Sequence, residues 1–186
     1  MPPFIVLHVC MGNICRSPMA ERLLTSALGQ TDDVLSHSAG TGGWHEGEEM
    51  NPPAARQVRS RGGDPDGFAA RKLRAEHIDA ADLVLTATAD QSEYVTALRP
   101  DAAAKTFVLG EFGRLIKEVD PATLPEPVYE RGVALVRAVD TVRDGRPPAS
   151  GDDLDDPWGR GDQVFGRVAD EIQASVVPLA KILTGK

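Results

Sequence analysis

The sequence contains little cysteine, few aromatic residues and no long apolar run. It has 186 residues, of which two are cysteine and 5 % are aromatic, and two cysteines cannot form a disulfide framework in a chain of this length. No apolar segment approaches the ~20 residues that a membrane-spanning helix needs. The N-terminal segment MPPFIVLHV has no basic region and no small-residue cleavage site. We therefore expect no signal peptide, no membrane insertion and a cytoplasmic location.

Acidic residues outnumber basic ones, 28 to 20. The formal net charge is −8, and the sequence has neither a block of lysine and arginine nor a basic stripe interleaved with aromatic residues. This composition argues against a nucleic-acid partner. An anionic substrate would need a local positive site rather than a positive surface.

Short apolar and β-branched segments alternate with segments of helical character. The expected strands are residues 4–9, 34–39, 82–87 and 106–109, and the expected helices are residues 18–28, 52–61, 90–98, 128–143 and 162–183. This alternation predicts an α/β fold with a parallel sheet and helices on both of its faces. Pro178 is expected to kink or interrupt the last helix.

Residues 117–155 differ in composition from the rest of the chain. Two stretches rich in Pro, Gly and Asp, EVDPATLPEP and DGRPPASGDDLDD, flank the amphipathic segment 128–143. We interpret residues 117–155 as an excursion from one domain that spans residues 1–186. Three roles stay open for this excursion: a cap over a site, a surface for a partner, or an inert addition.

Both cysteines lie in the segment CMGNICRS (residues 10–17), between the first expected strand and the first expected helix. The backbone N–H groups of such a loop can bind an anion, Gly12 allows a close approach, and the following helix adds partial positive charge. Arg16 supplies a planar cation suited to phosphate, and such surroundings favour the thiolate form of Cys10. The loop therefore predicts a nucleophile beside a phosphate site formed by Met11, Gly12, Asn13, Ile14, Cys15, Arg16 and Ser17.

Other interpretations of these thiols are available. Cys15 can be a buried packing residue, since free cysteine behaves as a small hydrophobe. His8, Cys10 and Cys15 could also ligate a metal, but a structural zinc site usually has a second ligand pair at short spacing, and none follows. We expect no metal and no cofactor.

The segment VCMGNICRSPMAE (residues 9–21) closely resembles the signature of the low-molecular-weight protein tyrosine phosphatases. The resemblance continues, in the family's order, with SAGTGGW (38–44), ARKL (70–73), ADLVLTA (81–87) and DPWG (156–159). It implies a four-stranded parallel sheet with the phosphate-binding loop between the first strand and the first helix. It also implies metal-free hydrolysis of phosphotyrosine in a protein or peptide substrate.

The resemblance assigns the chemical steps to three residues. Cys10 would attack phosphorus to form a cysteinyl-phosphate, while Arg16 and the loop amides hold the phosphoryl oxygens. Asp156 would protonate the tyrosyl oxygen and then activate water, and Pro157 biases Asp156 toward an extended conformation. We interpret the neighbouring Asp155 as a solvated carboxylate.

The resemblance also implies supporting roles within and around the loop. Ser17 would stabilise the thiolate, and Asn13 would fix the loop conformation with help from Ser38. Family members often carry a histidine that supports this asparagine, whereas this chain has Phe68 at the corresponding place. Cys15 matches a cysteine proposed to protect the nucleophile by forming a disulfide after oxidation.

Substrate choice depends on the pocket walls. Trp44 and Trp158 match the aromatic walls of the phosphotyrosine-specific members, and Ile14 matches these members as well. In contrast, Trp158 and Gly159 follow Asp-Pro where that branch often has two tyrosines, a pattern nearer to the arginine phosphatases.

Three alternatives to a tyrosine phosphatase therefore stay open. A protein arginine phosphatase and a thiol-dependent arsenate reductase share the fold, although the thioredoxin-coupled reductases need a later cysteine pair that this chain lacks. A non-enzymatic phosphate-binding regulator would need neither a nucleophile nor an acid.

Overall fold

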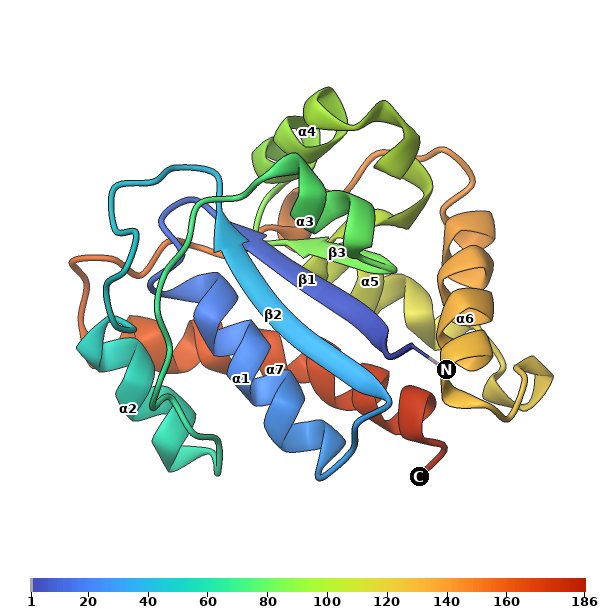
Figure 1. Ribbon diagram of the computed structural model, residues 1–186, viewed down its shortest axis with the longest axis horizontal. Coiled ribbons are helices and arrows are strands. Elements are labelled where there is room, and N and C mark those ends of the chain that lie inside the picture. The colour runs from blue at the N-terminus through green and yellow to red at the C-terminus, as the bar shows by residue number, and fades with distance from the viewer. Residues whose placement is uncertain (1) are drawn as a thin grey trace.

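Four parallel strands form the centre of the structure, a computed structural model that describes residues 2–186 (Figure 1). The strands are β1 (Phe4–Cys10), β2 (Val34–Gly40), β3 (Leu83–Thr86) and β4 (Thr106–Val108). Their order across the sheet is β2-β1-β3-β4, and every neighbouring pair is parallel. The predicted α/β class and four-stranded parallel sheet are confirmed.

Helices cover both faces of this sheet (Figure 1). The α-helices are α1 (Arg16–Leu28), α2 (Pro52–Ser60), α3 (Ala75–Ala80), α4 (Ala89–Leu98), α5 (Leu109–Leu115), α6 (Val128–Arg143) and α7 (Asp162–Thr184). Short 3₁₀ segments are η1 (Pro100–Lys105), η2 (Ile116–Glu118), η3 (Pro121–Thr123) and η4 (Ser150–Asp152). The sequence pattern missed α3, which has only six residues, and α5, which begins directly after β4 without a connecting loop.

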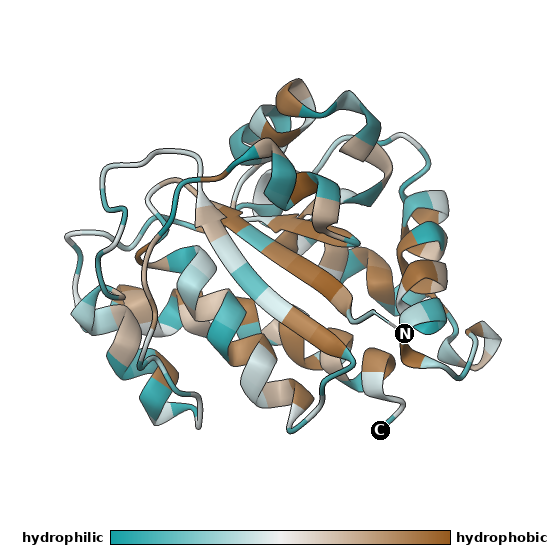
Figure 2. Cartoon of the chain, viewed as in Figure 1, coloured by the Kyte–Doolittle hydropathy of each residue, from teal (hydrophilic) through white to brown (hydrophobic). Residues whose placement is uncertain are grey.

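Two hydrophobic cores result from the alternation of side chains along β1. Val6 faces one core, which also contains residues of α1, α2, α5, α6 and α7. Leu7 and Val9 face the other core, which contains residues of α3, α4 and η1. Figure 2 shows the strongly apolar character of β1, as expected for a strand that is buried on both faces.

The interruption expected at Pro178 does not occur, because α7 continues to Thr184. A proline inside a helix costs about 3 kcal/mol, since it removes one hydrogen bond and crowds the preceding turn. Leu179 and Leu183, on the far side of the proline, are fully buried in the core. Burial of these side chains offsets the local cost.

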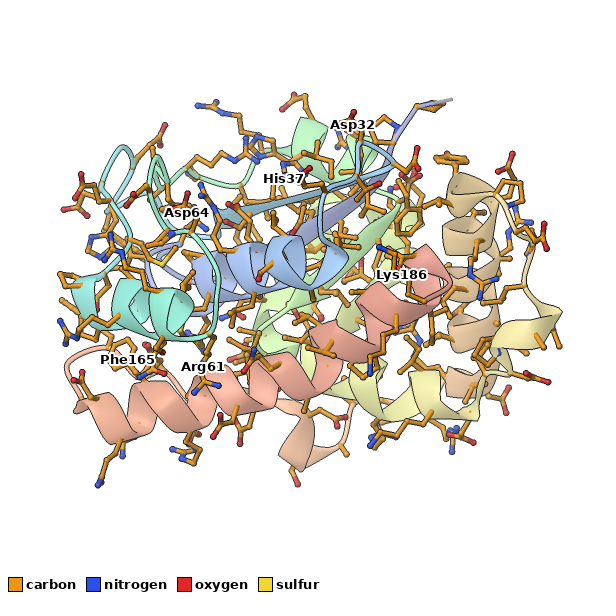
Figure 3. All side chains as sticks on the ribbon, turned by 90° about the horizontal axis from the view of Figure 1, so that it is seen from below. Asp32, His37, Arg61, Asp64, Phe165 and Lys186 are labelled. Carbon is orange, nitrogen blue, oxygen red and sulfur yellow. The ribbon has the colours of Figure 1, made fainter. Side chains whose placement is uncertain are left out.

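Hydrogen bonds from Arg61, the residue directly after α2, connect α2 to the long helix α7. The Arg61 guanidinium donates to Asp170 (2.7 Å) and Gln173 (2.6 Å) and to the Gly166 carbonyl (3.1 Å). Figure 3 shows Arg61 beside α7, near the buried Phe165. Among residues 2–186, no helix has the length and apolar character that crossing a membrane requires.

The excursion packs on the main core through α6. Leu135 and Val139 are fully buried within the core that contains α1 and α7. Arg143, at the end of α6, donates to the carbonyl oxygen of Thr106 on the edge strand β4 (2.7 Å), and its guanidinium lies 3.9 Å from the Phe107 ring centroid. Gly132 lets α6 approach the buried ring of Phe4 closely.

Gly132→Ala should therefore destabilise the protein, although alanine is the better helix former. An added Cβ would lie 2.4 Å from a Phe4 ring carbon, and overpacking of this kind costs about 1–3 kcal/mol. The matched control is Gly166→Ala in α7, where the nearest neighbour of the Cβ is 3.7 Å away. This control should gain up to about 1 kcal/mol in the free energy of unfolding in urea. Equal effects of the two substitutions would contradict the close approach of α6.

β1 also buries one histidine, and its burial makes stability depend on pH. Burial and the nearby His37 lower the pKa of His8 to about 3, so the folded state keeps His8 neutral. The unfolded chain takes up this proton below pH ~6.5, so stability falls as pH decreases from there toward the folded pKa. We expect His8→Gln to reduce the slope of unfolding free energy between pH 6 and 4 by about 1.4 kcal/mol per pH unit. Identical slopes for the two proteins would show that His8 is not held neutral.

Candidate active site

The segment 10–17 lies at the carboxyl end of β1 and runs into the N-terminus of α1. Cys10 is the last residue of β1, and Arg16 is the first residue of α1. Ligand sites of open α/β sheets form at the carboxyl end of strands where the strand order reverses, and here the order reverses beside β1. The backbone N–H groups of the loop and the start of α1 are therefore placed to bind an anion.

The Cys10 sulfur is buried and has two polar contacts. The Ser17 Oγ lies 2.9 Å from the Cys10 Sγ, and the backbone N–H of Asn13 donates to the same sulfur at 3.3 Å. The Cys10 residue is only 2 % exposed. Hydrogen bonds donated to sulfur stabilise its anionic form, which is the nucleophilic one.

Asn13 organises the loop by side-chain hydrogen bonds in three directions. Its backbone has the left-handed φ of 56°, which asparagine adopts more readily than most residues. Its Nδ2 donates to the Ser17 Oγ (2.8 Å) and to the Ser38 Oγ (3.0 Å), and its Oδ1 accepts from the Arg71 N–H (2.9 Å). The side chain is fully buried, and its two bonds to the serine hydroxyls are buried as well.

A buried carboxylate extends this network, and the sequence analysis missed its role. Glu21, on α1, accepts a hydrogen bond from the Ser38 Oγ (2.8 Å) and pairs with the Arg22 Nε (2.7 Å). The Arg22 guanidinium lies 5.8 Å from the Phe68 ring centroid. Thus Phe68, at the place of the family's histidine, packs beside a cation that faces Glu21. Glu21 belongs to the segment 9–21, but only the fold reveals its partner on β2.

Arg16 connects the loop to the segment that carries Asp156. Arg16 is 5 % exposed, its Nη1 donates to the Leu154 carbonyl oxygen (3.1 Å), and its Nη2 lies 3.8 Å from the Asp156 Oδ2. The Asp156 Oδ1 accepts from the Trp158 N–H (3.1 Å). Asp155 pairs instead with Arg167 on α7 (2.9 Å) and does not line the pocket.

A pocket opens above the loop, with a cavity of about 100 Å³. Trp44 and Trp158 lie on its walls and are 72 % and 49 % exposed. His45 also lines it, with its ring edge-on to Trp158 and its Nδ1 paired with Glu48. The sequence analysis missed His45, although it directly follows Trp44. The full lining consists of Cys10, Met11, Gly12, Ile14, Cys15, Arg16, Trp44, His45, Asp156 and Trp158, so no residue of the excursion before Asp156 takes part.

Cys15 lies in the same pocket, as a free and buried thiol. Burial raises its pKa to about 12, with further contributions from the negative charges of Cys10 and Asp156. The thiol of Cys15 is therefore held in its protonated form. His8, the third group of the metal interpretation, contacts Ser36, and residues 2–186 contain no group of three His, Cys, Asp or Glu side chains placed to hold a metal.

The fold and this pocket define an α/β protein with a cysteine and an arginine on one anion-binding loop. A family model described as low molecular weight phosphotyrosine protein phosphatase matches residues 5–147. The chain belongs to this family and is an enzyme of the phosphatase class. Asp156 lies outside the matched range.

Individual relatives agree with this membership. The low molecular weight protein-tyrosine-phosphatase YfkJ of Bacillus subtilis is 34 % identical over 128 residues, which cover 67 % of this chain and 80 % of that protein. The low molecular weight protein-tyrosine-phosphatase of Streptomyces coelicolor is 37 % identical over 135 residues, covering 67 % and 77 %. Among solved structures, the YwlE arginine phosphatase from Geobacillus stearothermophilus superposes with a TM-score of 0.72 at 28 % identity, covering 98 % of this chain and 94 % of that one.

Substitution of Asn13 should separate backbone strain from lost hydrogen bonds. Asn13→Gly keeps the left-handed backbone but removes all three side-chain contacts, so we expect a loss of about 1–3 kcal/mol in unfolding free energy. Asn13→Ala should lose about 1 kcal/mol more, because it also strains the backbone. Both variants should bind inorganic phosphate more weakly. Unchanged stability and phosphate binding in Asn13→Gly would show that the network does not hold the loop.

Proposed function

We propose that the protein hydrolyses phosphotyrosine in protein or peptide substrates through a cysteinyl-phosphate intermediate. The observation that carries this proposal is the convergence of Cys10, Arg16 and Asp156 on one pocket walled by two tryptophans. A phenyl ring would lie between Trp44 and Trp158, and its phosphoryl group would lie on the loop. Membership of the family supports the same assignment.

In the first step, the Cys10 thiolate attacks phosphorus, and the bond between phosphorus and the tyrosyl oxygen breaks. Protonated Asp156 gives its proton to that oxygen, so that a neutral phenol leaves. The loop amides and Arg16 hold the equatorial oxygens while charge develops on them. Because the Ser17 hydroxyl contacts the Cys10 sulfur, it stabilises the thiolate before attack.

In the second step, water attacks the phosphorus of the cysteinyl-phosphate. The Asp156 carboxylate accepts a proton from this water, the sulfur–phosphorus bond breaks, and inorganic phosphate leaves. The Cys10 thiolate and the protonated Asp156 are thereby restored. The charges of Arg16 and the loop amides act in both steps, and no step draws on a metal or an organic cofactor.

A second candidate is the hydrolysis of phosphoarginine at the same site. Gly159, the residue after Trp158, favours this candidate. Its φ of 75° is a conformation that glycine adopts readily, and glycine has no side chain. This position therefore adds no second aromatic ring beside Trp158. The similarity to a solved arginine phosphatase supports this candidate as well. The chemistry would differ only in the bond that breaks, phosphorus–nitrogen instead of phosphorus–oxygen.

For Cys15, its burial beside the loop supports the packing role. An attack on an oxidised Cys10 requires a thiolate, and the raised pKa of Cys15 keeps this form scarce. Two free thiols in one pocket suit a reducing compartment, and we retain the cytoplasm as the proposed location.

The decisive experiment compares turnover of a phosphotyrosine peptide and a phosphoarginine peptide in a chelator-treated buffer. Cys10→Ser should abolish turnover, and Asp156→Asn should lower kcat/KM for the tyrosine peptide by about a hundredfold or more. The matched control is Asp155→Asn, which removes the neighbouring carboxylate outside the pocket and should leave turnover unchanged.

Each outcome of this comparison has a defined meaning. Faster turnover of the phosphoarginine peptide would assign the protein to the second candidate. Turnover that survives Cys10→Ser would refute the cysteinyl-phosphate route. If Asp155→Asn were as slow as Asp156→Asn, the assignment of the acid would be wrong.

A further inference from the structure

We propose that the Arg114–Asp152 ion pair is a clamp that positions Asp156 for proton transfer, so that the excursion controls the acid step of the reaction. The proposal rests on the proposed function, since it requires Asp156 to be the general acid. Arg114 and Asp152 do not line the pocket, and both therefore act as positioning residues.

The first observation is a backbone contact between the end of the excursion and α5. A Cβ placed on Gly110 would lie 2.4 Å from the carbonyl oxygen of Asp152. The segment η4 therefore lies directly on the first turn of α5, at a position that accepts no side chain. This contact fixes where the chain leaves the excursion.

The second observation is the geometry of the ion pair. Asp152, with a side chain that is 6 % exposed, accepts from the Arg114 Nε (3.1 Å) and Nη2 (2.8 Å), while its Oδ2 also accepts from the Ala149 N–H (2.7 Å). Burial acts to raise the pKa of Asp152, but the hydrogen bonds from Arg114 and Ala149 and the charge of Arg114 leave that pKa lowered. A two-pronged contact of this kind fixes orientation as well as distance.

The third observation is that the next residues connect this clamp to the pocket without a break. Asp153 Oδ1 accepts from the Ala89 N–H at the start of α4 (2.9 Å), and the Leu154 N–H donates to the Ala87 carbonyl oxygen (2.9 Å). The Leu154 carbonyl oxygen accepts from Arg16, whose guanidinium faces Asp156. The segment is thus held at its start by the Arg114–Asp152 clamp, and next to Asp156 by the Asp155–Arg167 ion pair on the outside of the pocket (2.9 Å).

The position of the acid matters because proton transfer requires hydrogen-bond distance to the leaving oxygen. A displacement of about 1 Å at a reacting group can cost a hundredfold in rate. Loss of the clamp leaves the Leu154 contacts in place, so a partial displacement is expected. The cost should fall on substrates whose leaving group needs a proton.

The test compares two substrates of different leaving group. Asp152→Asn should lower kcat/KM for a phosphotyrosine peptide about tenfold. For dinitrophenyl phosphate, whose phenolate leaves without a proton, kcat/KM should stay within about twofold, as should the inhibition constant of inorganic phosphate. Arg114→Lys keeps a cation beside Asp152 but removes the planar guanidinium. It should give a smaller loss of kcat/KM, again for the phosphotyrosine peptide and not for dinitrophenyl phosphate.

The matched control is Asp79→Asn, which removes a carboxylate that accepts two hydrogen bonds from Arg99 (2.8 and 3.2 Å). Neither Asp79 nor Arg99 lines the pocket. This substitution should leave kcat/KM for both substrates unchanged. Thermal unfolding of each variant shows whether the assayed protein is folded. If Asp152→Asn does not fold, the comparison of the two substrates is made with Arg114→Lys.

The outcomes separate the clamp from the function on which it rests. A wild-type protein that hydrolyses neither substrate would overturn the proposed function. If Asp156→Asn shows the leaving-group selectivity but Asp152→Asn and Arg114→Lys do not, the clamp is refuted and the acid stands. Equal losses on both substrates would show that the ion pair supports the fold alone.

Discussion

The active-site loop depends on the buried hydrogen bonds of Asn13. A loop that points its amides inward leaves its own polar groups without helix or sheet partners, and a buried group without a partner costs about 1–3 kcal/mol. The side chain of Asn13 does not pair with these amides but fixes the path of the loop, because its amide group donates to the Ser17 and Ser38 hydroxyls and accepts from the Arg71 N–H. Its contacts join the loop to β2 through Ser38 and to the chain at Arg71. The Cys10 thiol is therefore held by a network anchored in the sheet.

Much of the fold could be predicted from the sequence, because its signals are local. Apolar runs marked the strands, and the helix from 128 to 143 was predicted at its observed bounds. Pro178 misled the prediction, since the burial of Leu179 and Leu183 depends on tertiary packing that no local pattern reveals. The short helix α3 has too few residues for a periodic signal.

The residues of the candidate site also differ in how far the sequence alone reveals them. The loop residues lie within eight positions of one another, so spacing and resemblance were enough to single them out. In contrast, Glu21 has its partner Ser38 on a different strand, and His45 reaches the pocket only because its loop folds back over Gly12. Asp152 looks like one acidic residue in an acidic stretch until the structure shows its burial against α5. Side chains whose role depends on long-range contacts leave little trace in a single sequence.

The contact between Arg143 and the edge strand β4 has a consequence for behaviour in solution. An edge strand offers unpaired backbone groups to any other chain, and such edges are sites of aggregation. In this protein, Arg143 at the end of α6 donates to the Thr106 carbonyl oxygen and lies over the Phe107 ring, so an added strand would have to displace this contact. The helix of the excursion thus covers one border of the sheet, at β4, and β2 forms the other border.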